Sequence, residues 1–144
     1  MTYRTNELTF NLPDGLLDRT VNIFSLTDEG PSEFGLVVTR VPLKAGQSLH
    51  SYAATQVAEM RTRMPQFVLI HEIEGVVRGQ PAMLLEFTWR SESMTLHQRQ
   101  VSFRMNALGG PVVVMMTGTC RDRFSPKWNK AFEAAVESVQ FDVA

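Results

Sequence analysis

The segment S-M-T-L-H-Q-R-Q-V-S-F-R-M-N, residues 93–106, alternates in the way that is typical of a β-strand. Successive side chains of a strand point to opposite sides of its sheet, so the segment has two different faces. One face carries Met94, Leu96, Gln98, Gln100, Ser102 and Arg104. The other carries Thr95, His97, Arg99, Val101, Phe103 and Met105. The first face starts apolar and continues with uncharged amides, a composition that suits holding a partner better than transforming a substrate.

This strand is the third of four consecutive strand patterns, which together predict an antiparallel meander. The other three are residues 66–76, 81–90 and 111–119, and the segments 76–80 and 108–110 have the glycines of hairpin loops. Upstream, three more strands are predicted at residues 8–12, 19–27 and 34–42, each bounded by Pro, Gly or Asp-rich turn sequences.

Two helices complete the prediction. The first covers residues 48–64, with Ser48 as its N-cap and Pro65 ending it. The second begins at Ser125 and Pro126, which suit the N-cap and the first helical position. Its apolar face is formed by Trp128, Phe132, Ala135, Val136 and Val139. Strands, a helix, more strands and a final helix predict an α+β fold with a mainly antiparallel sheet flanked by two main helices.

The composition indicates one globular domain over residues 1–144. Hydrophobic residues make up 44% and charged residues 20%, and the net charge is −1, which argues against binding nucleic acid. Cys120 is the only cysteine, so no intramolecular disulfide is possible. The N-terminus lacks the apolar core of a signal peptide, and no apolar run approaches the ~20 residues that span a bilayer. We therefore expect a soluble, cytoplasmic protein without direct membrane insertion.

The sequence offers little catalytic chemistry, and we predict no enzyme activity, no catalytic residue, no metal site and no cofactor. The three histidines, His50, His71 and His97, fall on a helix and two different strands without the spacing of a ligand pair. Cys120 can serve as a nucleophile only if a histidine lies beside it, and a buried hydrophobic role is the simpler interpretation. Glu72 and Glu74 share a strand face, which fits a solvated surface better than an acid–base pair.

Three glutamines are more informative. Gln56 interrupts the apolar stripe of the first helix, and Gln98 and Gln100 follow Met94 and Leu96 on one strand face. A buried amide costs free energy unless it forms hydrogen bonds, so two interpretations remain open. Each amide can bond to its neighbours at the edge of the core. Alternatively, the amides line a groove for an apolar partner, since polar groups among apolar side chains also hold transmembrane helices together.

The segment F-N-L-P-D-G-L-L-D-R-T-V-N-I-F, residues 10–24, resembles the opening hairpin of the DcrB-like family. The segment W-N-K-A-F-E-A-A-V-E-S-V-Q-F, residues 128–141, resembles its closing helix. The resemblance covers essentially the whole chain and is greatest to the Eag proteins, the effector-associated chaperones of bacterial type VI secretion. It implies a PsbP-like fold, in which helices flank a curved antiparallel sheet.

The resemblance also implies a function. A homodimer is expected to bind the N-terminal transmembrane region of a secreted toxin effector, shield its helices and help to load it onto the secretion spike. Strand parity and helical spacing then suggest which residues form the groove: Val21, Ile23, Val37, Thr39, Gln56, Met60, Met64, Leu96, Gln98 and Gln100. Gly35 lies beside them, where a small residue lets a helix approach closely.

Two other functions remain open. The chain can be a non-enzymatic binding module or accessory factor for a soluble protein partner, as other proteins of PsbP-like fold are. It can also be an unrecognised hydrolase that uses Cys120 or a histidine, although few residues are available for such a site.

Overall fold

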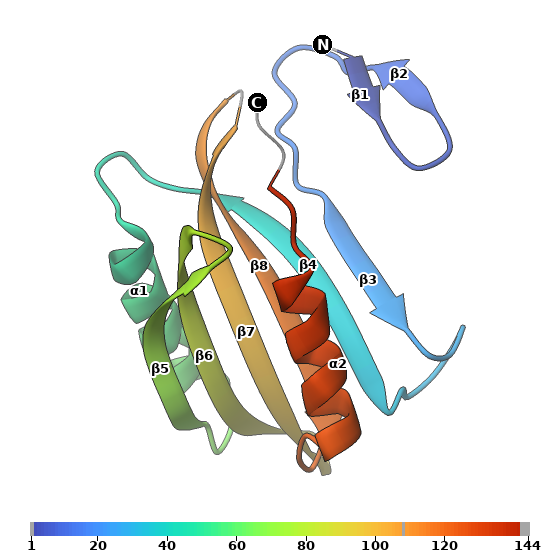
Figure 1. Cartoon of the computed structure of the whole chain (residues 1–144), viewed down its shortest axis with the longest axis vertical. Helices are drawn as coiled ribbons and strands as arrows, with labels where there is room; N and C mark the ends of the chain where they lie inside the picture. The colour runs from blue at the N-terminus through green and yellow to red at the C-terminus, as the bar shows by residue number, and fades with distance from the viewer. Residues whose placement is uncertain (1, 108, 142–144) are drawn as a thin grey trace.

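The computed structural model describes residues 2–107 and 109–141, and Figure 1 shows the arrangement of their helices and strands. The strands are β1 (Thr2–Arg4), β2 (Thr9–Asn11), β3 (Val21–Ser25), β4 (Phe34–Pro42), β5 (Val68–Val77), β6 (Gln80–Ser91), β7 (Met94–Ala107) and β8 (Gly110–Arg121). The helices are α1 (Leu49–Arg63) and α2 (Pro126–Glu137). Leu108, in the predicted loop 108–110, lies outside the described residues.

Six strands form one antiparallel sheet in the order β3-β4-β8-β7-β6-β5. The predicted meander is confirmed, because β5, β6, β7 and β8 are neighbours in sequence order. β4 joins the meander beside β8, and β3 lies at the edge (Figure 1). The predicted α+β fold class, a curved, mainly antiparallel sheet flanked by two main helices, is confirmed as well.

The N-terminal region differs from the prediction. Residues 10–24 do not form a hairpin, because β2 pairs with β1 and β3 pairs with β4. The linker between β2 and β3 contains Pro13, which lacks a backbone donor, and Asp18, which accepts hydrogen bonds from Thr20 and Arg40. The contact with Arg40 attaches the linker to β4. The small β1–β2 sheet lies apart from the main sheet (Figure 1).

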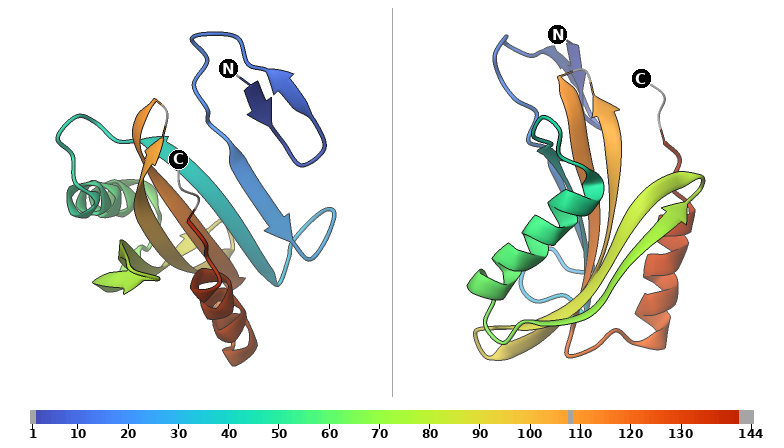
Figure 2. Two further views of the ribbon diagram at one scale, coloured as in Figure 1. Left: turned by 45° about the horizontal axis from the view of Figure 1, so that its top comes forward. Right: turned by 90° about the vertical axis from the view of Figure 1, so that its left-hand side faces the viewer.

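The two helices lie on opposite sides of the sheet (Figure 2). Each begins at the predicted N-cap: Ser48 Oγ accepts from the Ser51 backbone N–H at 3.0 Å, and Ser125 Oγ accepts from the Trp128 N–H at 3.3 Å. α1 ends one residue before the predicted end, so Met64 is its C-cap. α2 ends at Glu137, so Val139 lies beyond the helix on which it was predicted.

The core is divided between the two sides of the sheet. Phe132 and Val136 of α2 pack on Val101 and Phe103 of β7, together with neighbouring aromatic residues. On the other side, buried residues of α1 pack on β6, and partly buried residues at the start of α1 pack on β8. Because Val101 and Phe103 point to the α2 side, the glutamines of β7 must point to the α1 side.

Candidate functional site

The side of the sheet that carries α1, here called the α1 face, holds every strand residue that the sequence analysis assigned to the groove. Residues opposite each other in an antiparallel pair share a face. The register pairs Val21 with Thr39, Ile23 with Val37, and Gln98 with Thr119. The strand residues that lie on the α1 face are Val21, Ile23, Val37, Thr39, Leu96, Gln98 and Gln100.

α1 covers only part of this face. Met60 is 8% exposed and packs with Leu85 and Phe87, and Gln100 beneath the helix is 4% exposed. Met64 is partly buried against the same apolar cluster. Met60 and Gln100 therefore belong to the packed layer under α1, and an open surface can include only the remaining residues.

The uncovered part of the α1 face, here called the open strip, runs from the edge strand β3 to β7. Its apolar margin is exposed, with Ile23 at 73% and Val21 at 51%, and its other residues are half-buried. The open strip consists of Val21, Ile23, Val37, Thr39, Leu96, Gln98, Thr117 and Thr119. A Cβ atom added at Gly35 would lie within 4 Å of one atom only, the Phe24 carbonyl oxygen at 3.8 Å. Because Gly35 has no side chain, the surface of the sheet is lower there than at the neighbouring residues.

Thr117 and Thr119 were not among the predicted site residues. They lie opposite Val37 and Gly35 on one side and opposite Gln100 and Gln98 on the other. The sequence signal was the T-G-T step after the aliphatic run of β8, where hydroxyl groups begin to alternate with small residues. Sequence reasoning gave this strand no site residue, because the aliphatic run alone is typical of a buried strand.

Gln98 is held in place by two side-chain contacts. Its Nε2 donates to Thr119 Oγ1 at 2.8 Å, and its Oε1 accepts from Trp89 Nε1 at 2.6 Å. A side chain with both ends bonded keeps one orientation, so Gln98 presents a fixed amide at the border of the open strip.

Gln56 and Gln100 form a second polar contact, under α1. Gln100 Nε2 donates to Gln56 Oε1 at 3.0 Å, and the Sδ of Met115 lies 3.2 Å from Gln100 Nε2 and 3.4 Å from Gln56 Nε2. Of the two interpretations that the sequence left open, this geometry favours hydrogen bonding at the edge of the core for these two amides.

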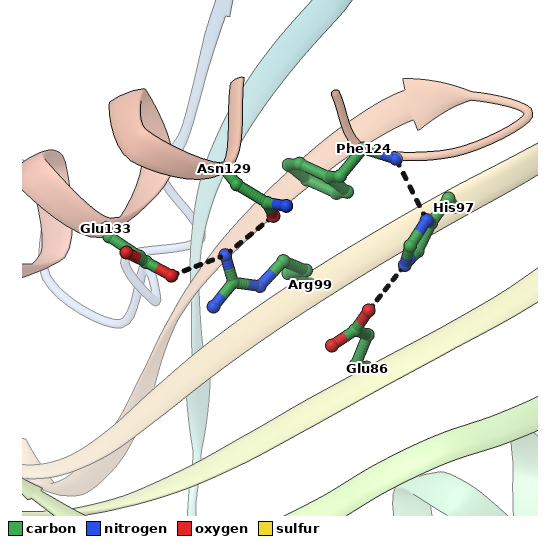
Figure 3. Close-up of polar contacts among 6 residues, drawn as sticks. All are labelled: Glu86, His97, Arg99, Phe124, Asn129 and Glu133. Atoms are coloured by element: carbon green, nitrogen blue, oxygen red, sulfur yellow. Dashed lines mark hydrogen bonds and ion pairs between the residues drawn. The ribbon is translucent and has the colours of Figure 1, made fainter. Parts of the chain in front are cut away.

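The opposite side of the sheet carries a polar cluster beneath α2, shown in Figure 3. His97 Nε2 lies 2.6 Å from Glu86 Oε2, and His97 Nδ1 accepts from the Phe124 backbone N–H at 3.0 Å. Arg99 donates to Asn129 Oδ1 at 3.0 Å and lies 3.4 Å from Glu133 Oε1, both on α2 (Figure 3). This cluster fastens α2 and the segment before it to β7.

Cys120 lies directly opposite His97 in the β7–β8 register, which is the neighbour that a cysteine nucleophile would need. Both ring nitrogens of His97 are, however, engaged by Glu86 and Phe124. Cys120 is 3% exposed, and burial raises the pKa of its thiol, which disfavours the reactive thiolate. The arrangement therefore gives Cys120 no activating base.

The other candidate polar sites are not assembled either. His50 of α1 pairs with Glu74 of β5 at 2.7 Å on an exposed surface, away from His97. Across residues 2–107 and 109–141, no group of three or more His, Cys, Asp or Glu side chains is positioned to hold a metal ion. Within the same residues, neither helix has the length and apolar character needed to cross a membrane.

Comparison with known proteins gives a consistent family. The DcrB family model matches residues 7–138. A protein named effector EagT6 from Pseudomonas aeruginosa is 28% identical over 137 residues, covering 93% of this chain and 94% of that protein. The crystal structure of PA94 from Pseudomonas aeruginosa, described as a protein of unknown function and putative regulator, is 25% identical. It superposes with a TM-score of 0.80 over 100% of this chain and 98% of that chain.

A more distant structure, the PsbP protein of Synechocystis, superposes with a TM-score of 0.49 at 13% identity, over 96% of this chain and 89% of that chain. The family model alone covers most of the chain, from the linker before β2 to the residue after α2. The resemblance drawn from the sequence is thereby confirmed: this chain belongs to the DcrB family.

Proposed function

We propose that this protein is an effector-associated chaperone of a bacterial type VI secretion system. It binds the N-terminal transmembrane helices of a toxin effector in the cytoplasm, shields them from water, and helps to load the effector onto the secretion spike. Its role is binding and not catalysis. The similarity to EagT6 along 93% of the chain supports the association with an effector.

The observation that carries this proposal is the composition of the open strip. Val21, Ile23 and Val37 supply aliphatic surface, and Thr117, Thr119 and Gln98 add hydroxyl and amide groups at the border of α1. Transmembrane helices pack through small residues and hydrogen-bonding side chains placed among apolar ones. The open strip offers the same mixture, so it can replace the neighbours that such a helix has in a membrane.

The shape of the surface supports a helix as the ligand. Gly35 makes the floor low between Thr119 on β8 and Ser25 on β3, so a helix backbone can come close to the sheet. α1 lies on the same side of the sheet (Figure 2), so a bound helix has to lie beside α1, over the strands that α1 leaves uncovered. Covering several hundred Å² of a transmembrane helix, at about 25 cal/mol per Å², contributes several kcal/mol before the entropic cost of association.

A binding experiment tests the proposal. The chain is co-expressed with a candidate type VI toxin effector that has apolar N-terminal segments, once intact and once with those segments deleted. We expect the intact toxin to accumulate and to copurify with the chain, and the shortened toxin not to bind. Copurification that persists after the deletion would contradict the proposal and would favour a binding module for a soluble partner.

A further inference from the structure

The edge strand β5 is accessible along its outer side. It is the last strand of the six-stranded sheet, and the right-hand view of Figure 2 looks onto this edge, with α1 and α2 on either side of it. Residues 70–74 are all exposed. Among residues 2–107 and 109–141, no backbone–backbone hydrogen bond joins residues 71–77 to any strand other than β6. The free backbone groups of an edge strand can pair with an added strand.

Pro81 of β6 shows which residues of β5 direct their backbone groups outward. Val76 lies opposite Pro81, which has no N–H group, so these two residues cannot exchange both ladder hydrogen bonds. Hydrogen-bonded and non-hydrogen-bonded pairs alternate along an antiparallel ladder, so Glu74 and Glu72 also belong to non-hydrogen-bonded pairs. The N–H and C=O groups of Glu72, Glu74 and Val76 therefore point away from β6, to the free edge.

The two faces of β5 carry side chains of different chemistry. Glu72 lies opposite Leu85, which packs with α1, so Glu72 and Glu74 are on the α1 face. Glu74 Oε1 lies 2.7 Å from His50 Nδ1, and both of these side chains are largely exposed. Ile73 points to the α2 side and is 49% exposed. A strand added at this edge would therefore meet carboxylates on one face and apolar surface on the other.

An apolar groove continues from Ile73 toward α2. A cavity of about 370 Å³ lies between α2 and the β5–β6 hairpin, and Ile73 lines a smaller cavity of about 140 Å³ that shares part of its wall. A Cβ added at Gly75 would lie 2.9 Å from Leu84 Cδ1, so Leu84 fills the place beside β5 where that strand has no side chain. The residues that line both cavities include Leu84, Val101 and Phe132.

We propose that the β5 edge binds an extended segment of another protein in which basic and apolar side chains alternate. The segment adds to the sheet as an antiparallel strand and pairs with the outward backbone groups of Glu72, Glu74 and Val76. Its basic side chains lie opposite Glu72 and Glu74, because opposite charges that face each other across a strand pair attract. Its apolar side chains lie opposite Ile73 and Gly75, beside the apolar groove.

The same carboxylates argue against a second copy of this chain at this edge. Antiparallel pairing of two β5 strands would bring Glu72 of one copy beside Glu74 of the other, and like charges in opposite positions are destabilising. The register irregularity between Leu69 and His71 also limits regular pairing to the later part of the strand. β5 and β3 form the two opposite edges of the sheet, so a segment bound at β5 leaves the open strip free.

Synthetic peptides test the proposal without any effector. One short peptide alternates valine and lysine, and its matched control alternates valine and glutamate; binding of each is measured by isothermal titration calorimetry. We expect the lysine peptide to bind and the glutamate peptide to bind at least about tenfold more weakly, because the cross-strand charge pairs change sign. Glu72→Lys combined with Glu74→Lys should exchange this preference, since both side chains are exposed and the fold should persist. Equal affinity of the unchanged chain for the two peptides would overturn the proposal.

Amide hydrogen exchange locates the bound peptide. The amides of Glu72, Glu74 and Val76 should exchange rapidly in the free chain and slowly with the lysine peptide bound, whereas exchange at Ile23 on the other edge should not change. Protection that appears at Ile23 and not on β5 would overturn the proposal. So would amides of Glu72, Glu74 and Val76 that are already protected in the free chain because two copies pair there.

A proline substitution separates the backbone pairing from the charge. Glu72→Pro removes an outward donor and leaves the ladder with β6 intact, a place where edge strands tolerate proline. Glu72→Gln removes the same charge and keeps the donor, so it is the matched control. We expect the folded Glu72→Pro protein to bind the lysine peptide at least about tenfold more weakly than Glu72→Gln does. Equal binding by the two variants would show that the peptide does not add to the sheet as a strand.

Discussion

Gln100 on the central strand β7 donates its amide to Gln56 of α1 over 3.0 Å, and this contact is almost completely buried on the β7 side. It fixes how α1 lies across the sheet and therefore where the open strip begins. The two glutamines thus act on the site by positioning α1, and only Gln98 of the predicted amides remains at its border.

Removing this contact should destabilise the fold. Gln100→Ala leaves the Gln56 carbonyl without its buried donor, so we expect a loss of about 1–3 kcal/mol in the free energy of unfolding. Gln140→Ala, at an exposed position after α2, serves as the control and should change little. A double-mutant cycle with Gln56→Ala measures the coupling directly. A coupling energy near zero in urea denaturation would show that the hydrogen bond does not position α1.

Replacing Gly118 or Gly35 by alanine should have different effects on the stability of the fold. A Cβ at Gly118 would lie 2.7 Å from Phe132 Cδ1 and 3.2 Å from Phe124 Cζ, inside the α2 core. We expect Gly118→Ala to cost about 1–3 kcal/mol through overpacking, as a lower melting temperature would report. Gly35→Ala meets only an ordinary contact and should leave the melting temperature nearly unchanged.

Gly35 also separates folding from binding. A larger side chain there should raise the floor of the open strip and weaken binding of a transmembrane helix while the protein stays folded. Gly35→Leu is therefore expected to have a native circular-dichroism spectrum and a lower yield of copurified effector. Full effector binding by Gly35→Leu would show that binding does not depend on a small residue at this position.

The carboxyl group of Asp18 should make the free energy of unfolding depend on pH in the acid range. Burial acts to raise the pKa of Asp18, but hydrogen bonds from Thr20 and the charge of Arg40 outweigh burial and hold that pKa below its ordinary value of 3.8. The charged form is thus favoured in the folded state, so its contribution is present above pH 3.8 and is lost as the pH falls through the lowered value.

Asp18→Asn tests this linkage. Because Asp18 and Arg40 are partly exposed, we expect the substitution to cost less than about 1 kcal/mol at pH 7 and to cost progressively less as the pH falls through the lowered pKa of Asp18. The measurement is the free energy of unfolding of both proteins across this range, with Asp14→Asn in the exposed turn as the control. A difference that grows as the pH falls would contradict the assignment.

The thiol of Cys120 should react slowly with alkylating reagents while the protein is folded. Its thiol is buried and its pKa is raised by burial, so iodoacetamide should modify it slowly in the folded protein and rapidly in urea. Cys120→Ala should leave effector accumulation in cells unchanged. Loss of that accumulation in a folded Cys120→Ala protein would revive the hydrolase interpretation.

The sequence predicted the main sheet well, since strand alternation and turn residues are local signals. In β7 it separated Val101 and Phe103 from the glutamines, and the register places those two sets on opposite faces. It failed at the N-terminus, where β1 and β2 have only three residues each and pair with each other. Strands this short are too brief to show a periodic pattern.

The sequence predicted the candidate site only in part, because the site also depends on how the helix packs on the sheet. Parity assigned residues to a face, but it could not show how far α1 extends over that face. Met60 was therefore included although it packs from α1 against the sheet, and Gln100 although α1 covers it. Thr117 and Thr119 were omitted although they lie in the open strip.

A pair of substitutions on β4 tests whether the open strip binds the transmembrane region of an effector. Val37 points into the open strip, and its neighbour Val38 is also half-buried but points to the other side of the sheet. Both Val37→Glu and Val38→Glu are co-expressed with the same candidate toxin effector, and copurified toxin is quantified for each folded variant. We expect Val37→Glu to abolish copurification and Val38→Glu to preserve it. Equal copurification by the two variants, or loss only with Val38→Glu, would contradict it.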